Sequence, residues 1–449
     1  MRGLVLAVVL LPSLASAQSA TDSLPPIESV FPLKWAQRIG QTTFRTNLLA
    51  AEGYVLAPSN GVSRNNLLDP DDGLWVLSGT TGEVVYRIHP TGAGDTDVNG
   101  LALDGRRLYF GNDLGQVFCT SISGKEHWQV ALEGDIEGSP VLVDVNRDGT
   151  LDCVVATEDP ATLVALDGTT GAKLWSFTPR DYGTFMATPL AYDLTGDGLP
   201  DYVIGLAGGR SIFAVNGATG RQMWRYQTLA RAGLVDGSAV HASATLITES
   251  GKPPLILAAE VHGQLHYITP EGRADRFLSA PTGLFSSPIV SPRGTVILGA
   301  SWQGKGSIHL ADAGPDDHWK EGSFAIRTLL WKHYHSGKPT GRVSASASIA
   351  DVLADSTWQL LIPTEDGQLQ LFTEDGTLLH RLRLPAGAEA SCLVADVDGD
   401  GTLELLIATL DGYLRCYATR GTQVFWGSFR GGPHNLGVWP GGTSGGGGN

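Results

Sequence analysis

The chain has 449 residues, among them 58 glycines and 24 prolines, and 31 lysines and arginines against 46 aspartates and glutamates give a formal charge of −15. This acidic balance argues against nucleic acid or an anionic membrane surface as a partner, because both repel an acidic protein. Many glycines and prolines with only 17% charged residues are typical of short strands joined by tight turns.

The N-terminus has the features of an export signal. Met1-Arg2-Gly3 is a basic start, an apolar run follows from Leu4 to Leu14, and Ala15-Ser16-Ala17 is a small-residue cleavage site. No later segment approaches the roughly 20 apolar residues that a membrane span requires. We therefore expect residues 1–17 to be removed and the protein to be secreted or periplasmic, with residues 18–32 as a loose lead-in.

Residues 33–440 repeat one unit and are interpreted as a single domain. The clearest copy begins at Ser139, SPVLVDVNRDGTLDCVVATEDPATLVALDGTTGAKLW, and consists of four short apolar runs bounded by Gly, Asp, Asn or Pro. The links between the runs are too short for parallel crossovers. Each unit is therefore predicted to be an antiparallel meander of four strands.

Eight such units follow one another, at 44–88, 97–131, 138–178, 186–227, 239–278, 285–332, 344–384 and 389–429. Asp144 recurs as Asp193, 49 residues later, and a period of 40–50 residues is typical of propeller blades. We predict an all-β propeller of eight four-stranded blades, or of seven if the weakest unit, 97–131, is not a blade. An extra strand around Trp35 would close the ring on the last blade. The tail at 441–449, GGTSGGGGN, has nothing to bury and is expected to be disordered.

Two family patterns are present. Residues 163–175, LVALDGTTGAKLW, resemble the repeat of pyrroloquinoline-quinone-type (PQQ-like) propellers, as do 212–224 and 74–86. The acidic stretches resemble FG-GAP (VCBS-type) repeats, in which a first strand runs into D-x-D-x-D-G. Residues 426–437, WGSFRGGPHNLG, are similar to a segment common at the ends of PQQ-like proteins. These resemblances imply a propeller but no particular activity, because such propellers include enzymes, assembly scaffolds and adhesins.

The link between the first and second strands of three units has oxygen-bearing side chains at loop positions 1, 3, 5 and 9 and glycine at position 6. Calcium takes 6–8 oxygen ligands at about 2.3–2.6 Å, and this spacing wraps a short loop around one ion, with the carbonyl at position 7 as a further ligand. We predict structural calcium. The expected ligands are Asp144, Asn146, Asp148, Thr150 and Asp152 in the first loop, Asp193, Thr195, Asp197, Leu199 and Asp201 in the second, and Asp396, Asp398, Asp400, Thr402 and Glu404 in the third.

The alternative is that these loops are solvated acidic turns without metal, since Asp and Asn are favoured in turns anyway. They are not EF-hands, because the twelfth position holds Val155, Ile204 and Ile407. Another unit has lost the pattern, with Leu353 at the third position after Asp351.

The links from second to third strands, and from blade to blade, lie at the end of the propeller opposite the acidic loops. We call this end the loop face; it has the longest links, at 227–239 and 333–344, and long loops on a rigid scaffold are where binding usually occurs. Its four histidines could converge as metal ligands or bases, although scattered surface histidines are the simpler interpretation. The residues expected on this face are Glu158, Asp159, Arg180, Asp181, Tyr182, Arg231, His241, His262, Trp302, His333, Tyr334, His335, Lys338, Arg342, Glu365 and Asp366.

The repeated tryptophans and the cysteines are interpreted as core residues. One large aromatic residue on each fourth strand packs between neighbouring blades, and each cysteine lies inside a predicted strand as a buried free thiol. Two of the cysteines fall on the first and third strands of one unit, roughly 9–10 Å apart, beyond the reach of a disulfide. The residues are Trp128, Trp175, Trp224, Trp331 and Trp426, and Cys119, Cys153, Cys392 and Cys416.

These features predict an exported, monomeric, non-catalytic propeller with structural calcium that binds a protein or polysaccharide partner through the loop face. One alternative is a quinoprotein dehydrogenase; that resemblance implies adjacent cysteines above the quinone, and no Cys-Cys dipeptide exists here, so the quinone is not expected. The other is a propeller polysaccharide lyase or hydrolase. Neither a G-x-S-x-G elbow nor an H-E-x-x-H motif is present.

Overall fold

The computed structural model describes residues 23–62, 70–89, 94–228, 240–248, 252–279, 283–302, 305–312 and 342–439. The predictions for residues 1–17 and 441–449 lie outside this part of the chain. The same holds for Arg231, Trp331, His333, Tyr334, His335 and Lys338, and for the side chain of Trp302.

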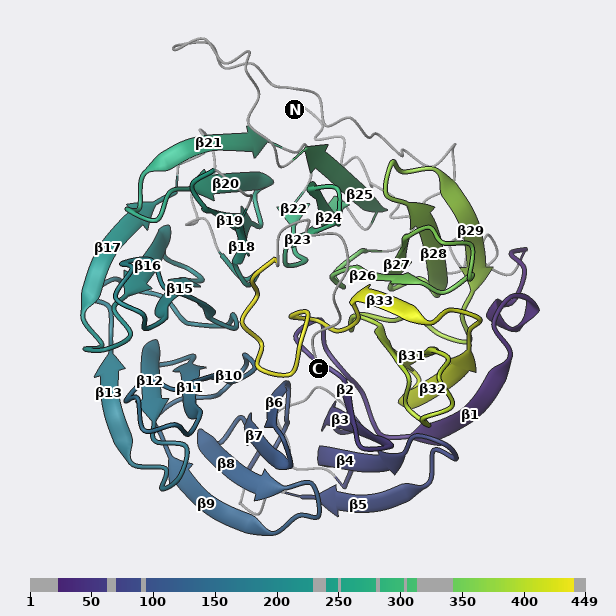
Figure 1. Cartoon of the computed structure of the whole chain (residues 1–449), viewed down its shortest axis with the longest axis horizontal. Coiled ribbons are helices and arrows are strands. Elements are labelled where there is room, and N and C mark those ends of the chain that lie inside the picture. Colours follow the sequence, from purple (N-terminus) through teal and green to yellow (C-terminus); the bar gives the residue numbers. More distant parts are fainter. Residues whose placement is uncertain are drawn as a thin grey trace, which may run out of the picture.

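Eight antiparallel sheets surround a central axis (Figure 1). In the regular blades the first strand along the chain lies nearest the axis and the fourth lies on the rim. The prediction of an eight-bladed all-β propeller is confirmed, and the unit at 97–131 is a blade. Short turn-bounded runs of Val, Ile, Leu and aromatic residues favour strands, and each run is too small to bury its apolar face without its neighbours.

The first four blades are regular meanders. Blade 1 contains β2 (Leu49–Ala51), β3 (Tyr54–Asn60), β4 (Asp72–Ser78) and β5 (Val84–Ile88), and blade 2 contains β6 (Leu101–Asp104), β7 (Arg107–Gly111), β8 (Gln116–Ser121) and β9 (Glu126–Ala131). Blade 3 contains β10 (Val141–Val143), β11 (Asp152–Thr157), β12 (Thr162–Leu166) and β13 (Lys173–Phe177), and blade 4 contains β14 (Leu190–Tyr192), β15 (Asp201–Gly205), β16 (Ser211–Val215) and β17 (Gln222–Gln227).

The other four blades complete the ring. Blade 5 contains β18 (Thr245–Ile247), β19 (Leu255–Glu260), β20 (Gln264–Ile268) and β21 (Ala274–Ser279). In blade 6, β22 (Gly283–Leu284) and β23 (Ile289–Val290) both pair with β24 (Thr295–Trp302), which pairs with β25 (Lys305–Asp312). Blade 7 contains β26 (Ser348–Asp351), β27 (Gln359–Pro363), β28 (Gln368–Thr373) and β29 (Leu378–Arg383), and blade 8 contains β30 (Leu393–Ala395), β31 (Glu404–Thr409), β32 (Tyr413–Ala418) and β1 (Leu33–Arg38).

The ring closes through the first strand of the chain. β1 pairs antiparallel with β32, as predicted for the strand around Trp35. The prediction that Trp426 lies on a fourth strand is wrong, because β1 already occupies that position in blade 8. Instead β33 (Gln423–Trp426) pairs with β26 of the neighbouring blade, which becomes a five-stranded sheet.

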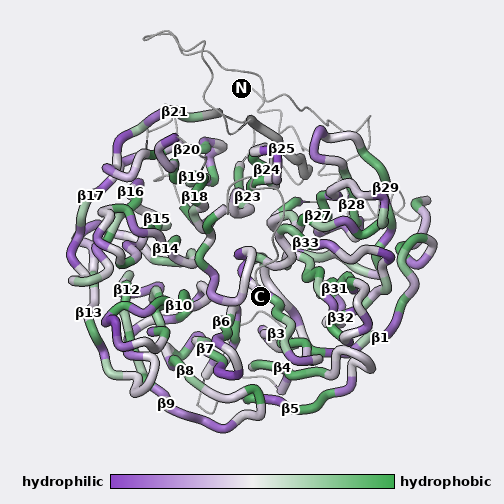
Figure 2. The backbone as a smooth tube through the Cα atoms, viewed as in Figure 1, coloured by the Kyte–Doolittle hydropathy of each residue, from purple (hydrophilic) through white to green (hydrophobic). Residues whose placement is uncertain are grey.

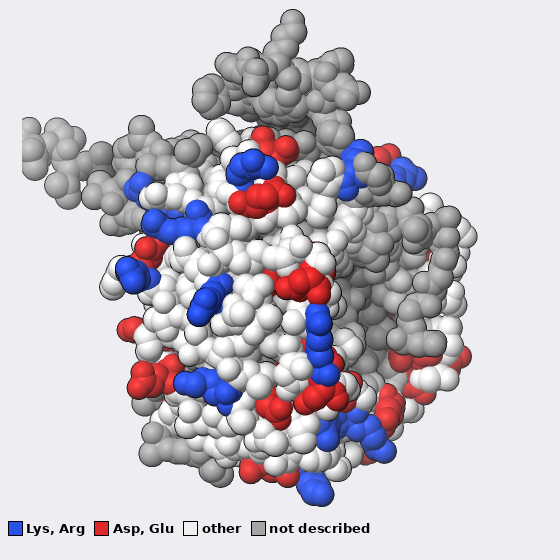
Figure 3. All heavy atoms as spheres, turned by 60° about the vertical axis from the view of Figure 1, so that its left-hand side comes forward, with Lys and Arg blue, Asp and Glu red and all other residues white. Residues whose placement is uncertain are grey.

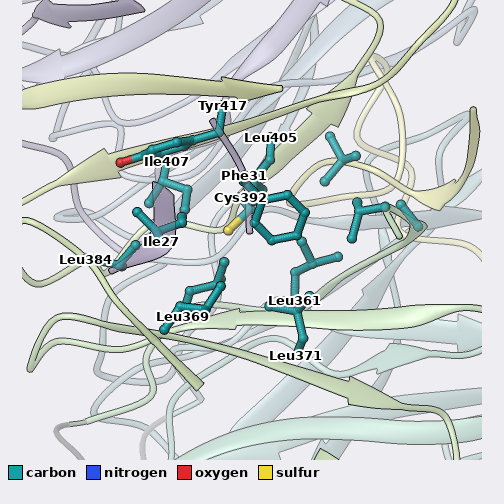
Figure 4. Packing of buried hydrophobic residues seen from close by; sticks show 14 of the residues in the cluster. Ile27, Phe31, Leu361, Leu369, Leu371, Leu384, Cys392, Leu405, Ile407 and Tyr417 are labelled. Carbon is teal, nitrogen blue, oxygen red and sulfur yellow. The ribbon is translucent and has the colours of Figure 1, made fainter. Parts of the chain in front are cut away.

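The lead-in is anchored, not loose, from residue 25 onwards. Ile27, in the short 3-10 turn η1 (Ile27–Ser29), and Phe31 are buried in the cluster between blades 7 and 8 (Figure 4). The Pro25 carbonyl accepts a hydrogen bond from the Arg383 N–H at 2.8 Å, and the Pro32 carbonyl accepts one from Ala418 at 2.8 Å. Burial of the two apolar side chains explains this anchoring, which was not predicted from the sequence.

Apolar residues follow the inner and middle strands, whereas polar residues gather on the turns and outer strands (Figure 2). Every residue of β11 is buried, while most of β13 is exposed or half-buried. All four cysteines are buried free thiols, as predicted. The core is therefore a ring of apolar layers between facing blades, not a single central cluster.

Tryptophan side chains join consecutive blades. The Trp128 indole Nε1 donates a hydrogen bond to the Gly168 carbonyl of the next blade at 3.0 Å, and Trp175 does the same to Gly217 at 2.7 Å. In the same turn Gly171 has φ +73°, and a Cβ there would lie 2.9 Å from the Trp128 ring. These contacts confirm the predicted packing role of Trp128 and Trp175 and explain why Gly-Thr-Thr-Gly recurs.

Candidate functional site

The first two acidic loops fold around their leading aspartate. Asp144 accepts hydrogen bonds from the N–H groups of Asp148 at 3.1 Å and Gly149 at 2.9 Å. Asp193 accepts them from Gly196, Asp197 and Gly198 at 2.7, 3.2 and 2.9 Å. Burial acts to raise the pKa of Asp193, but these N–H groups outweigh it and hold the pKa below its usual value.

The fifth and seventh positions complete these turns. Asp148 Oδ1 accepts a hydrogen bond from Thr150 N–H at 2.8 Å, as Asp197 Oδ1 does from Leu199. Asn146 Oδ1 accepts one from Asp148 N–H at 2.9 Å, and the Thr195 hydroxyl lies 3.4 Å from Asp193. The loops are exposed, so their carboxylates can be reached from solvent.

The carboxylate at the ninth position accepts backbone hydrogen bonds in both loops. Asp152 is buried and accepts N–H bonds from Val145 at 2.9 Å and Gly168 at 2.9 Å. Asp201 makes the equivalent bonds to Leu194 and Gly217, at 3.1 and 3.0 Å. Burial raises the pKa of both groups. These carboxylates therefore tie the acidic loop to the turn between the third and fourth strands.

The hydrogen bond within the loop also exists in a blade that has lost the acidic pattern. Gln359 Oε1 accepts a hydrogen bond from Val352 N–H at 2.8 Å, seven residues earlier. At the ninth position an amide oxygen can therefore accept the same backbone hydrogen bond as a carboxylate oxygen. In the sequence, only this glutamine at the ninth position indicated that the position accepts backbone hydrogen bonds.

The third loop includes a cation from elsewhere in the chain. Lys34, on the closing strand β1, forms an ion pair with Asp398 and with Glu404 Oε1, the latter at 2.8 Å, and its Nζ lies 4.0 Å from Asp400. Burial acts to lower the pKa of Lys34, but the hydrogen bonds from Asp398 and Glu404 outweigh it and raise the pKa. An ammonium group therefore lies among the oxygens predicted to bind calcium.

Asp396 organises this loop as Asp144 does the first. It accepts N–H bonds from Gly399 at 2.7 Å and Gly401 at 3.0 Å, and the Thr402 hydroxyl and N–H both bind Asp400. Among the residues that the structure describes, oxygens of three or more acidic residues come within 4.8 Å of one another at two places. One is the set Asp396, Asp398 and Glu404, and the other is on the loop face.

The second set, which we call the acidic cluster, consists of Asp72, Asp95 and Asp97 between blades 1 and 2. Asp97 accepts a hydrogen bond from Asn60 Nδ2 at 3.1 Å, and the Thr96 hydroxyl donates to Asp72 at 3.0 Å. Burial, and next the neighbouring Asp95, raise the pKa of Asp97 to about 8. The cluster was not predicted from the sequence, because β4 and the link to blade 2 contain no repeated acidic motif.

Further acidic residues extend the cluster toward blade 3. Burial, with Glu137 and Asp97 nearby, raises the pKa of Asp113 to about 9. Burial, with Asp159 nearby, also raises the pKa of Asp135. Glu158, predicted on the loop face, has its pKa raised by burial and by Glu137. The loop face over blades 1–3 is therefore dominated by mutually repelling carboxyl groups.

Nearer the axis one arginine partly balances this charge. Arg45 Nη1 lies 2.8 Å from Glu137 Oε2, and Glu137 also accepts a hydrogen bond from Asn99 at 3.1 Å. Burial, and then Arg45, lower the pKa of His241 to about 4. Of the other predicted residues, Asp181 pairs with Arg225 at 2.7 Å and Tyr182 is 92% exposed. In the described part of the chain, neither His241 nor His262 belongs to a set of three or more close metal-ligand groups.

The C-terminal segment 427–439 runs across the axis of the ring (Figure 1). Backbone carbonyls of Pro433, His434, Leu436 and Gly437 accept hydrogen bonds from the inner strands of blades 2, 3, 4 and 5, at 2.9, 3.2, 3.3 and 3.1 Å. Arg430 is buried and donates to the Ala244 carbonyl at 2.8 Å, and burial lowers its pKa to about 9. The segment therefore binds the inner strands of four blades to one another.

A family model for PQQ-like repeats, described as outer membrane protein assembly factor BamB, matches residues 76–314, more than half of the chain. The chain belongs to this family. The PQQ-like part of the expected resemblance is thus confirmed, while the resemblance to FG-GAP repeats stays a prediction. No curated protein matches the chain.

Solved structures share the fold. BamB from Moraxella catarrhalis aligns with a TM-score of 0.59 at 16% identity, covering 87% of this chain and 100% of that one. Quinohemoprotein alcohol dehydrogenase from Comamonas testosteroni gives 0.64 at 15% identity, covering 86% and 76%. The computationally designed protein Ika8 gives 0.56 at 14%, covering 85% and 99%. At these identities the similarity concerns the fold alone.

Among the described residues, carboxyl groups dominate the loop face over blades 1–3, and the four cysteines are buried separately as free thiols. Within the described ranges no helix is long and apolar enough to cross a membrane.

Proposed function

We propose that this protein is an exported, non-catalytic propeller that binds a protein partner through its loop face and acts as an assembly scaffold. The family is described as an outer membrane protein assembly factor, which suggests the assembly of outer membrane proteins as the process. We take the loop face, rather than the rim, as the binding surface because binding loops on a rigid scaffold concentrate there.

One observation carries the choice of surface, namely the acidic cluster and its extension through Asp113, Asp135 and Glu158. Figure 3 shows basic and acidic side chains intermingled on the rim. Arg273 and Glu271, both exposed, also form an ion pair. Near the acidic cluster the ionised side chains are mostly carboxylates, and Asp97 and Asp113, whose pKa values are raised to about 8 and 9, can ionise when a cationic group approaches. Such a surface attracts a partner of positive charge. The partner segment is therefore expected to be basic.

Structural calcium remains part of this proposal for the loops that begin at Asp144 and Asp193. Both are exposed, and both hold their leading carboxylate by backbone N–H groups. In the loop at Asp396 the ammonium group of Lys34 lies among the expected calcium ligands, so calcium would have to displace it. We expect the first two loops to respond to calcium more strongly than the third.

Site-specific photo-cross-linking tests the surface. Asp159 and Thr169 are exposed residues of blade 3 at opposite ends of the ring, so a photoreactive residue at each position gives a matched pair. We expect adducts with a component of outer membrane protein assembly from position 159 and not from 169. Charge reversal by Asp135→Lys should remove them. Equal adducts from both positions, or none in cells that express the protein, would contradict the proposal.

Activity assays test the non-catalytic part. Purified protein incubated with pyrroloquinoline quinone and calcium should not reduce a dye in the presence of alcohols or sugars. Acidic polysaccharides should likewise remain intact. Turnover in either assay would overturn this part of the proposal, while the cross-linking result would still stand.

A further inference from the structure

A buried glutamate in blade 5 has no hydrogen-bond donor among the residues that the structure describes. Glu260 is 1% exposed at the end of β19, and no described group donates a hydrogen bond to either carboxylate oxygen. An ionised carboxylate without partners is costly to bury, so such groups are paired, protonated or bound to metal. The surroundings of Glu260 decide among these possibilities.

A histidine on the adjacent strand points to the same place. His266 is fully buried, and its Nε2 lies 3.9 Å from Glu260 Oε2 without a hydrogen-bond partner of its own. Glu260 pairs with Gln264, and Ala258 with His266, so the three polar side chains lie on one face of the β19–β20 hairpin. Gln264 Oε1 is also buried without a donor.

The distance suits a shared ion better than a direct contact. At 3.9 Å the two atoms are too far apart for a hydrogen bond. Two ligands of one tetrahedral zinc ion lie roughly 3.4 Å apart, given zinc–ligand bonds of about 2.0–2.2 Å. A small side-chain rotation would bring the imidazole nitrogen and the carboxylate oxygen to that separation.

A tyrosine from the neighbouring blade orients the histidine for metal binding. Tyr226, on β17, has its hydroxyl 3.0 Å from His266 Nδ1. When the Nδ1–H donates to this oxygen, the lone pair of Nε2 points toward Glu260. Histidines that bind metals usually donate their other ring N–H to such an outer partner.

We propose that Glu260 and His266 bind one divalent transition metal ion of the zinc class, with Gln264 Oε1 as a further oxygen ligand and Tyr226 as a positioning residue. The turn that contains His262 joins the two strands at the loop face, so the site lies directly beneath that face. It is separate from the acidic loops, which are at the opposite end of the ring, and it does not depend on the proposed function.

Metal titration of the full chain tests the site. After treatment with a chelator, wild-type protein should bind one equivalent of zinc at this site, and cobalt(II) should give a visible absorption band there. Glu260→Gln and His266→Gln should each weaken binding at least 100-fold and remove the band. Tyr226→Phe should weaken it roughly 10- to 100-fold. His127→Gln, on the exposed outer strand β9, is the matched control and should bind as wild type does.

The variants also distinguish a ligand role from a structural one. Glu260→Gln keeps the shape but removes the buried charge, so the metal-free variant should melt no lower than metal-free wild type and should lose only the zinc-dependent rise. If His266→Gln fails to fold, the zinc binding of Glu260→Gln and Tyr226→Phe still tests the proposal. Wild type without zinc-dependent melting, or Glu260→Gln binding zinc like wild type, would overturn the proposal.

Discussion

Single residues hold neighbouring blades together at the turns. The second glycine of Gly-Thr-Thr-Gly adopts a left-handed backbone conformation and lies against the tryptophan of the preceding blade, as Gly171 does against Trp128. Only glycine meets both requirements, because any Cβ would be strained by the backbone and would collide with the ring. The repeat motif therefore encodes an inter-blade contact within a local turn.

Substituting Gly171 by alanine tests this contact. Gly171→Ala should lower the free energy of unfolding by about 2–4 kcal/mol, from left-handed strain of roughly 1–2 kcal/mol and displacement of the ring. Gly149→Ala is the matched control, because Gly149 has φ +86° with nothing within 4 Å of a new Cβ. It should cost the strain alone. Urea unfolding measures both, and equal losses would mean that the Trp128 contact contributes nothing.

The raised pKa of Asp97 makes stability depend on pH. Because its pKa is about 8 in the folded protein and about 3.9 in an unfolded chain, the folded state holds one more proton between these values. The contribution of the Asp97 proton to the free energy of unfolding is complete below about pH 4, declines as the pH rises, and is lost above about pH 8. Each pH unit in this window costs about 1.4 kcal/mol.

Asp97→Asn should flatten this dependence. The asparagine oxygen can still accept the Asn60 hydrogen bond, so the variant should match wild type near pH 4 and exceed its stability at pH 8–9. Urea unfolding at pH 5, 7 and 9 measures the slopes. Parallel curves for the two proteins would show that Asp97 does not titrate in this window.

Among the elements, the closing strand β1 does more than complete a sheet. Its Lys34 reaches the third acidic loop and pairs with Glu404, whose side chain is 1% exposed. Removing one partner of a buried pair leaves the other charge uncompensated. The closing strand thus fixes the charge balance of a loop that lies at the opposite end of the sequence.

Lys34→Met should therefore lower the free energy of unfolding by about 1–3 kcal/mol, a value reduced from that of fully buried pairs because Lys34 is partly exposed. Adding Glu404→Gln should restore most of the loss, since Gln359 shows that an amide can accept the same backbone hydrogen bond. Thermal or urea unfolding of the single and double variants gives the coupling. Additive losses would mean that the pair is not coupled.

The first acidic loop is predicted to respond to calcium. Addition of calcium at about 100 times its dissociation constant should stabilise the protein by about 2.7 kcal/mol, and chelation should lower the melting temperature. Asp144→Asn should reduce this response. Asp351→Asn is the control, since Asp351 accepts N–H bonds from Asp355 and Ser356 in a loop with Leu353 at the third position. A melting temperature indifferent to chelator would identify the loops as plain turns.

For the whole molecule, the C-terminal segment connects the inner strands of several blades. It contributes backbone acceptors to blades 2–5 and buries Phe429 and Trp439. Truncation after Trp426 keeps β33 and should lower the free energy of unfolding by at least about 5 kcal/mol, from several hydrogen bonds of about 0.5–1.5 kcal/mol each and lost apolar burial. A chain ending at Trp439 is the control and should unfold like the full chain. Equal stability of the two truncations would contradict this role.

The sequence by itself determined the propeller of seven or eight blades, the antiparallel meander, the turn motif, the packing of Trp128 and Trp175 between blades and the burial of the cysteines, because each depends on contacts within one repeat or between adjacent repeats. It also placed the acidic loops, and whether they bind calcium stays a prediction. The closing of blade 8 by β1 was also predicted from the sequence. Only the tertiary structure decided that β33 joins blade 7 and that Lys34 lies beside Asp398. The acidic cluster, which lies between two blades, also emerged only there. Sequence periodicity fixes what each repeat does locally, whereas closing the ring brings together residues from opposite ends of the chain and from facing blades, and no spacing along the chain records those contacts.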